Sequence, residues 1–416
     1  MISNNWLYLE PFVHISLIRN KVLLYNTLNG KALEYINNIK IYNLVKRLNY
    51  NKNLLVVKLT DSDLGNTEIK SFLHKIRVNY MGDLINSPVI KSKPIQIKPI
   101  FNIQRNIQIL KESEEVSIGT RVMQNLTDVS ININNECNLK CTNCNDTFKQ
   151  FHFCTKYKSS KTELNIFYIK KIITALAGSS LKKLNITGGN ILKYSKIEEL
   201  TNLLINHASS TEFYIHYKNI LECKDAFSLL NNKFLLNVLI DFPINLYVLE
   251  SINVLIIKKN IKTSFTFIIN KIENIVEAEE TILRLTIENF TILPYFDSNN
   301  FSFFKNNVFI SKKDLYESKP SITEIYAREV INPNYFGKLC IMCNGSIYAN
   351  LNGKVIGNIK NLDLNEAANK EMKEGTSWRK TRTNIKPCKD CLFKFLCPPI
   401  SDYEYRVSRY NLCKIN

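Results

Sequence analysis

A chain of 416 residues exceeds one ordinary domain, so two or three units, each with its own core, are expected. Hydrophobic residues make up 45% of the chain, which is typical of a globular protein. The net charge of +18 is spread along the whole sequence without a nucleic-acid recognition motif, so we expect no nucleic-acid partner. No apolar stretch approaches the roughly 18 residues that a membrane-spanning helix needs, and no membrane contact is expected.

Cysteine usage indicates the compartment. The sequence has 11 cysteines, most of them in two tight groups. Residues 1–11 lack the charged and apolar regions of a secretory signal. This grouping favours metal binding in a reducing compartment over disulfides, so we expect a cytoplasmic protein.

Residues 1–85 predict a small α/β unit. Phe12–Ile18 and Lys21–Tyr25 have the composition of strands around an Arg19-Asn20 turn. Such a sheet offers a strand edge to which an extended peptide can add as a further strand, although a plain packing role is the alternative. Helical patterns follow at residues 31–36, 39–48 and 68–77, and an apolar run follows at 81–85.

Residues 86–127 predict an extended linker, because Pro88, Pro94 and Pro99 stand among basic and apolar residues. From residue 128 strand and helix patterns alternate. Six strands alternating with helices predict a parallel sheet with right-handed crossovers, and in parallel barrels the chemistry lies at the carboxyl ends of the strands. The strands are expected at residues 129–133, 183–187, 212–217, 235–241, 264–270 and 289–294.

Three cysteines follow the first of these strands. Cys137, Cys141 and Cys144 have the spacing CxxxCxxC, which no common protein-only zinc site uses. Thiolates in so tight a run hold iron–sulfur clusters, and a [4Fe–4S] cube on three cysteines leaves one iron free to bind a small molecule. A structural zinc ion is the alternative.

Other polar residues follow the next strands. Gly188-Gly189-Asn190 ends the second strand, and its glycines allow the backbone to come close to a ligand. Asp241 ends the fourth strand, and two roles are possible for its side chain: it faces the substrate, or it caps the following helix. For His216, near the end of the third strand, we favour a structural role. Cys154 and Cys223 have no cysteine partner at ligand spacing and are interpreted as buried or spare thiols.

Residues 335–416 carry the second cysteine group. The group forms CxxCx5C followed by a distal cysteine, four thiolates without an open iron, for which tetrahedral zinc is the alternative to a cluster. Asn344-Gly345 predicts a type I′ hairpin turn. Cys340 and Cys343 are expected on opposite faces of the first hairpin strand, and we favour the interpretation that they bind no metal. The four cysteines of the group are Cys388, Cys391, Cys397 and Cys413.

Residues 128–416 resemble radical S-adenosylmethionine (SAM) enzymes that carry a C-terminal SPASM domain. The resemblance implies an α/β protein with a partial (β/α)6 TIM-like barrel at 128–334 and a SPASM-like auxiliary cluster domain at 335–416. Cys137, Cys141 and Cys144 would hold the [4Fe–4S] cluster that binds SAM, and the second cysteine group would hold one auxiliary [4Fe–4S] cluster. Gly188-Gly189-Asn190 stands where the family has a Gly-Gly-Glu element that holds the amino group of SAM.

The chain departs from the family pattern at four positions. Asn143 replaces an aromatic residue beside the third cysteine, and Asn190 replaces the glutamate. Ser401 and Asn350 replace two ligands of the first auxiliary cluster, so two clusters are expected and not three.

The resemblance implies a peptide maturase. Reductive cleavage of SAM would give a 5′-deoxyadenosyl radical that modifies a ribosomally made precursor peptide by a crosslink or an epimerisation. Residues 1–85 resemble the winged-helix-like leader-peptide recognition domain of such enzymes, Asp241 would lie near the substrate, and a flavodoxin or ferredoxin would act as reductant. Two alternatives stay open: a modifier of a protein, like sulfatase maturases, and a non-catalytic, cluster-bearing partner that binds the peptide.

Overall fold

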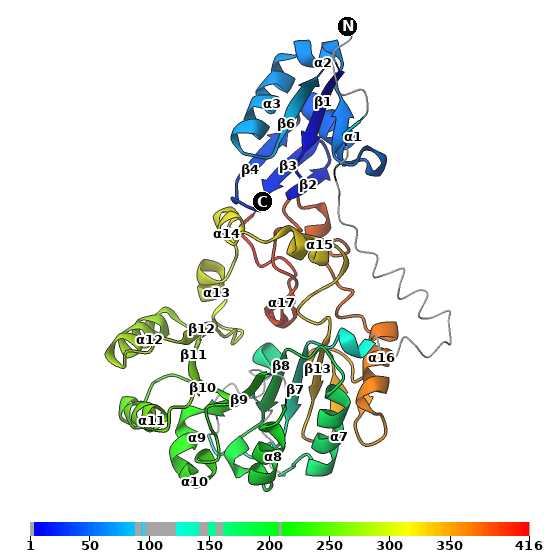
Figure 1. Cartoon of the computed structure of the whole chain (residues 1–416). Coiled ribbons are helices and arrows are strands. Elements are labelled where there is room, and N and C mark those ends of the chain that lie inside the picture. The colour runs from blue at the N-terminus through cyan, green and yellow to red at the C-terminus, as the bar shows by residue number, and fades with distance from the viewer. Residues whose placement is uncertain are drawn as a thin grey trace.

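The computed structural model describes residues 4–87, 93–94, 96, 122–139, 141, 149–154, 161–207 and 210–415. Figure 1 shows the N-terminal unit at one end of the molecule and a helix-covered sheet at the other. Much of the C-terminal segment, including α17 (Asp402–Val407), lies between them. In the described part of the chain, no helix combines the length and apolarity that crossing a membrane requires.

The N-terminal unit contains two three-stranded antiparallel sheets. Its core lies between these sheets and the helices, where Leu44, Phe72 and Ile76 are buried. One sheet has the order β5 (Val56–Lys58), β1 (Asn4–Leu9) and β6 (Gly82–Ser87); the other has β2 (Val13–Ile18), β3 (Lys21–Asn26) and β4 (Ala32–Ile36). The helices are α1 (Ile39–Asn49), α2 (Asp61–Gly65) and α3 (Thr67–Val78), with a 3-10 turn, η1, at Asn51–Asn53.

The predicted helix at residues 31–36 is wrong. These residues form β4, which pairs with β3 from Ala32 opposite Tyr25 onwards. Six residues are too few to sustain a helix without strong tertiary support, whereas β3 offers an unpaired edge directly after the turn at Gly30. The helices predicted at 39–48 and 68–77 are confirmed as α1 and α3.

Little of the predicted linker is described. Pro88 and Pro99 lie outside the described residues, and Pro94 has no regular structure. At the end of the linker Val122, Met123 and Leu126 are buried in the same core as the large sheet, so this part packs as core and not as a spacer.

The six predicted parallel strands are confirmed. They lie side by side in sequence order, each joined to the next through one or more helices, which is the arrangement expected of an open α/β barrel. The strands are β7 (Asp128–Asn132), β8 (Lys183–Thr187), β9 (Ser210–His216), β10 (Leu235–Ile240), β11 (Thr263–Ile269) and β12 (Phe290–Pro294). The connecting elements are α7 (Ile166–Leu176), η2 (Ile191–Lys193), α8 (Ile197–Leu204), α9 (Tyr217–Glu222), α10 (Lys224–Phe227), α11 (Leu246–Lys259) and α12 (Ile272–Arg284).

The two faces of this sheet differ in chemistry. On one face apolar side chains such as Ile131, Ile186 and Val238 pack against the helices and form the main core. The strand register places polar side chains next to one another on the other face. We call this second face the inner polar face, and it includes Ser130, Asn132, Asn185, Thr187, Glu212, Tyr214, His216 and Asn237.

The sheet continues past the expected boundary at residue 335. β13 (Lys338–Ile341) pairs in parallel with β7 and extends the sheet beyond its first strand. The antiparallel strands β14 (Ser346–Tyr348) and β15 (Gly357–Asn358) follow. The remaining elements are α13 (Phe301–Asn307), α14 (Lys312–Glu317), α15 (Ile322–Val330), α16 (Leu364–Glu374), η3 (Cys388–Asp390) and α17.

The predicted hairpin is present, but its turn differs. Between Met342 and Gly345 only Gly345 has a positive φ, +90°, and its N–H donates to the Met342 carbonyl at 2.7 Å. A type I′ turn needs positive φ at two residues, so the hairpin uses another turn that ends on this glycine. As a further correction, Cys340 lies on β13 but Cys343 lies in the turn, because the strand ends at Ile341.

Candidate functional site

Two loops pack closely at the carboxyl ends of β7 and β8. The Gly189 N–H donates to the Asn134 carbonyl at 3.0 Å, and the Asn190 N–H donates to the Glu136 carbonyl at 2.5 Å. A Cβ on Gly189 would lie 2.2 Å from the Glu136 carbonyl oxygen, and one on Gly188 would lie 2.6 Å from the Asn134 Oδ1. The two glycines therefore allow the loop that leads into the cysteine motif to come close to the turn after β8.

Asn190 uses its side chain inside the protein. It is 1% exposed, its Oδ1 accepts from the Leu192 N–H at 3.2 Å, and its Nδ2 lies 3.6 Å from the Cys223 Sγ. The amide thereby caps η2, the 3-10 turn after β8. Its expected contact with the amino group of SAM stays a prediction.

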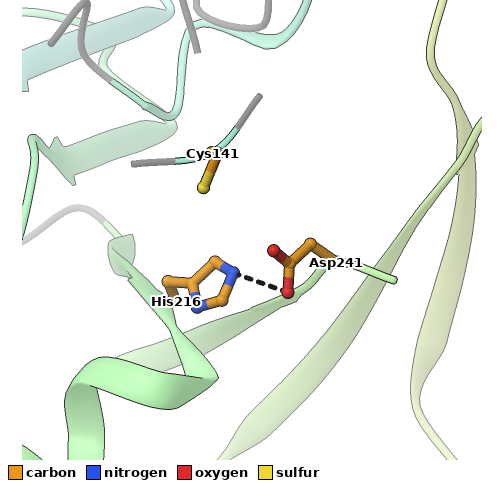
Figure 2. Close-up of side chains that lie close together, drawn as sticks. All are labelled: Cys141, His216 and Asp241. Atoms are coloured by element: carbon orange, nitrogen blue, oxygen red, sulfur yellow. Dashed lines mark ion pairs between the residues drawn. The ribbon is translucent and has the colours of Figure 1, made fainter. Parts of the chain in front are cut away.

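A carboxylate and an imidazole face one cysteine of the motif. One ligand atom each from Cys141, His216 and Asp241 lies within 4.8 Å of the others, as Figure 2 shows. The His216 Nε2 is 3.2 Å from the Asp241 Oδ1, and the Lys218 Nζ is 3.0 Å from the same oxygen. The side chains come from the ends of β9 and β10 and from the start of α9, so sequence segments far apart meet at one edge of the sheet.

Local structure fixes the orientation of the imidazole. His216 ends β9 and caps α9, since its Nδ1 accepts from the Lys218 N–H at 3.3 Å. The other ring nitrogen, Nε2, lies 3.2 Å from the Asp241 Oδ1, without the geometry of a hydrogen bond. In the register of β9 and β10, His216 lies beside Leu239, which brings the strand end at Asp241 within reach.

The Asp241 carboxylate is ionised at neutral pH. Burial raises the pKa of Asp241, but the contacts with His216 and Lys218 outweigh burial and hold the pKa below its usual value. Burial likewise lowers the pKa of Lys218, while the bond to Asp241 raises it to a net higher value. Asp241 and Lys218 therefore form an ion pair that is part buried, with side chains 33% and 35% exposed.

Sequence reasoning missed Lys218 and gave His216 a structural role. His216 does cap a helix, yet it also contacts Asp241 beside Cys141. The signal for Lys218 was its position two residues after a strand end, on the first turn of the next helix. Cys137 and Cys141 are both partly buried. Cys144 and Asn143 lie outside the described residues.

The four cysteines of the second group surround one cavity. Cys388, Cys391, Cys397 and Cys413 all line a space of about 600 Å³. The first begins η3, and the last reaches the cavity through a β-bridge to Ile310. The structure therefore brings together the set that the spacing indicated.

The spacing of these four sulfurs is wide. Among the described residues the Cys141 group alone has three potential ligand atoms mutually within 4.8 Å, so no three of the four sulfurs are that close. A tetrahedral zinc ion with Zn–S bonds of ~2.3 Å needs sulfurs roughly 3.8 Å apart. In a [4Fe–4S] cube each thiolate binds a different iron, which spaces the sulfurs farther apart.

A buried arginine lies against this cavity. The Arg382 Nη1 is 3.4 Å from the Cys388 Sγ and 3.0 Å from the Glu404 Oε1. Burial raises the pKa of Cys388, which Arg382 opposes, and burial raises the pKa of Cys397 to about 12. Buried thiols of this kind become thiolates when a metal centre compensates their charge.

The positions expected for the first auxiliary cluster have other roles. The Ser401 N–H donates to the Glu404 Oε2 at 2.9 Å at the start of α17. Asn350 is 2% exposed, and its Oδ1 accepts from the Asn352 N–H at 2.7 Å. Cys340 lines a different cavity, of about 380 Å³, and burial raises the pKa of its thiol to about 12.

Comparison with known proteins finds solved structures that are similar to this chain. SuiB is similar to it over nearly its whole length. SuiB of Streptococcus suis bound to the precursor peptide SuiA has 13% identity and a TM-score of 0.48. SuiB bound to S-adenosylmethionine has 13% identity and a TM-score of 0.49, and both matches cover 98% of this chain and 100% of SuiB.

A second similar protein is HemN, coproporphyrinogen III oxidase of Escherichia coli, a radical SAM enzyme. It has 14% identity and a TM-score of 0.30 over 47% of this chain and 48% of HemN. No protein-family model and no curated protein matches the chain.

Proposed function

We propose that the chain is a radical SAM enzyme that cleaves SAM reductively to a 5′-deoxyadenosyl radical and modifies a ribosomally made precursor peptide. The main support is the position of the cysteine loop at the carboxyl ends of the parallel strands β7 and β8. There it packs on the Gly188-Gly189 turn, and Cys141 faces Asp241. A [4Fe–4S] cluster on Cys137, Cys141 and Cys144 would supply the electron for SAM cleavage.

The inner polar face supports a substrate role for the interior of the sheet. The cavity of about 380 Å³ on this face is lined by Tyr214, Phe151 and Phe153, whose rings stack at centroid distances of 5.1 and 5.6 Å. Gln150 fixes this segment, because its side chain both donates to and accepts from the Phe296 backbone. In the proposed enzyme these side chains contact the peptide. Asp241, which does not line this cavity, is proposed to lie near the substrate at the carboxyl ends of the strands.

The second cysteine group is proposed to hold one auxiliary [4Fe–4S] cluster. Its support is the single cavity that the four thiols line. Four thiolates leave no open iron, so this cluster would pass electrons or hold the fold without binding substrate.

The N-terminal unit is proposed to bind the leader of the precursor peptide. In the described part of the chain, β2 and β4 each pair with β3 alone, which leaves edges for an added strand. The unit packs on the auxiliary site, where Leu23 and Tyr25 join one apolar cluster with Leu392 and Phe393. The same proposal includes a winged-helix-like recognition domain at residues 1–85, a cytoplasmic location, and a flavodoxin or ferredoxin as reductant.

The test uses the full chain, reconstituted with iron and sulfide without oxygen. With reductant and SAM it should form 5′-deoxyadenosine, and Cys137→Ala should abolish this product. Cys154→Ala removes a thiol of the same region outside the motif and should leave the product unchanged. The two-cluster proposal expects about eight irons per chain, four for each cube, and about twelve would refute it.

If the wild-type chain forms no 5′-deoxyadenosine and Cys137→Ala changes neither iron content nor peptide binding, the enzyme proposal fails. A chain that then still binds the precursor peptide would be the non-catalytic partner instead.

A further inference from the structure

One buried cation faces the cavity that the second cysteine group lines. Of the charged residues around this cavity, Arg382 is the one that is buried, with its side chain 8% exposed. Glu34 and Lys312 also line the cavity, but they pair with each other at 2.5 Å and add no net charge. The other charged residues of the lining are partly or fully exposed: Lys21, Asp390, Lys394 and Lys414.

The folded chain holds the Arg382 guanidinium in one orientation. Its Nη1 donates to the Cys388 Sγ at 3.4 Å, and its ion pair with Glu404 uses both carboxylate oxygens. Its Nε donates to the Pro398 carbonyl at 2.7 Å, and its Nη1 also donates to the Tyr410 carbonyl at 3.0 Å. The contact between guanidinium and sulfur is therefore fixed by partners on several sides.

The positive end of this ion pair points toward the sulfurs. Burial raises the pKa of the Cys388, Cys391 and Cys397 thiols, and the charge of Arg382 opposes that rise at all three. Glu404 raises the pKa of Cys388, but its effect there is smaller than that of Arg382. The ion pair thus presents a net positive charge to the cysteine group.

A cation at this place changes the redox chemistry of an iron–sulfur cluster. Reduction adds one electron to a [4Fe–4S] cluster, so its thiolate sulfurs become more negative and accept a hydrogen bond from a charged donor more strongly. Hydrogen bonds to the sulfurs, net charge and solvent exposure are among the factors that set the reduction potential. Because Arg382 is buried, water screens its charge little.

We propose that Arg382, positioned by Glu404, raises the reduction potential of the auxiliary [4Fe–4S] cluster on the second cysteine group. The inference rests on the proposed function and deepens it, because it favours electron uptake over a purely structural role for this cluster. A cluster with a raised potential accepts one electron from a weaker reductant. Arg382 acts through Cys388 and is a positioning residue, not a catalytic one.

A redox titration of the full chain tests this inference. The parent carries Cys137→Ala, Cys141→Ala and Cys144→Ala, so that the second group alone gives the cluster signal in electron paramagnetic resonance. Arg382→Gln in this parent should lower the midpoint potential, and Arg382→Lys should recover part of the loss. Glu404→Gln should raise the potential. The double variant Arg382→Met with Glu404→Leu leaves no uncompensated charge and should lower the potential.

The matched control is Arg284→Gln. Arg284 pairs with Glu250 at 2.7 Å, but it lies on α12 with its side chain 61% exposed. Figure 1 shows α12 with the helix-covered sheet, at the far end from the N-terminal unit, on which the segment of the second cysteine group packs. Its replacement removes one arginine charge away from the cluster, so the midpoint potential should equal that of the parent.

Two outcomes overturn the inference. Equal midpoint potentials in the parent and in Arg382→Gln would do so. Shifts of the same sign in Arg382→Gln and Glu404→Gln would also do so, because they would indicate a general loosening of the site. If Arg382→Gln does not fold, the double variant and Glu404→Gln decide by the same signs. Failure of the proposed function looks different, since the parent would then hold zinc or no metal and give no titratable signal.

Discussion

The buried ion pair beside the second cysteine group allows a demanding test of the structure. The side chains of Arg382 and Glu404 are 8% and 2% exposed, and the guanidinium contacts both carboxylate oxygens at 3.0 and 3.3 Å. Arg382 also donates to the Pro398 carbonyl at 2.7 Å, to the Tyr410 carbonyl at 3.0 Å and toward the Cys388 Sγ. The guanidinium thus joins three segments around the cavity.

Arg382→Met should lower the free energy of unfolding by about 3–5 kcal/mol, because it leaves the Glu404 carboxylate buried without a cation. Replacing both residues, as in Arg382→Met with Glu404→Leu, should cost less than the single change, since no uncompensated charge remains. Denaturant unfolding can be followed by the fluorescence of Trp378, which is 1% exposed in this region, in a Trp6→Phe background.

The pH dependence gives the sharper check. Burial already raises the pKa of Glu404 even with Arg382 present, and removing Arg382 should raise this pKa further. A carboxyl whose pKa is higher in the folded state contributes stability at low pH and loses it as the pH rises through the folded value. The deficit of Arg382→Met should therefore shrink from pH 7 to pH 5. A deficit of the same size at both pH values, or a double variant as unstable as the single one, would refute the reasoning.

Three further predictions concern other parts of the chain. Gly189→Ala should lower the amount of iron bound at the first cysteine motif, because the added Cβ would lie 2.2 Å from the Glu136 carbonyl oxygen. Gly178→Ala, with open space around it, should leave the iron content unchanged. Equal iron contents of the two variants in an iron analysis would contradict this prediction. Burial raises the pKa of Glu371 to about 7, so its contribution to stability is present below the pKa of the unfolded chain and is lost as the pH rises through 7. The free energy of unfolding, measured by thermal unfolding, should therefore decrease by on the order of 3 kcal/mol between pH 5 and pH 8. Glu371→Gln should remove this decrease. Ile36 lies on β4 with its side chain 60% exposed, and Ile36→Asp should weaken the binding of a labelled precursor peptide by roughly 1 kcal/mol. Val254→Asp, at a side chain 65% exposed on α11, should leave this binding unchanged. If fluorescence anisotropy gives equal affinities for the two variants, β4 is not part of the peptide site.

The six parallel strands could be predicted because each one is short, keeps apolar residues on at least one face, and stands between amphipathic helices. The face of each strand that is buried under the helices is apolar whichever helix covers it, so the sequence alone shows the strand. Residues 31–36 were mistaken for a helix because six residues do not distinguish the two periods, and pairing with β3 decided the outcome. The pairing of β13 with β7 joins residues more than 200 positions apart, and no local pattern signals it.

The candidate site divides in the same way. The cysteine groups and the glycine turn are local patterns, and Cys388, Cys391 and Cys397 do meet Cys413 at one cavity. The contacts of Asp241 come from the register between strands and from a helix cap, which depend on the folded chain. The inward turn of Asn190 was equally hidden, since an amide can face a ligand or cap a turn with the same sequence.

The pairing of β13 with β7 has a consequence for exchanging parts of this protein with those of a relative. A chimaera joined near residue 335 would separate the two strands and expose the backbone N–H and C=O groups along the outer edge of β7. Long unpaired edges recruit strands from other chains and lead to aggregation. A junction placed before β7 or after β15 keeps that edge covered. The barrel segment and strands β13–β15 therefore have to be exchanged together, although they are far apart in the sequence.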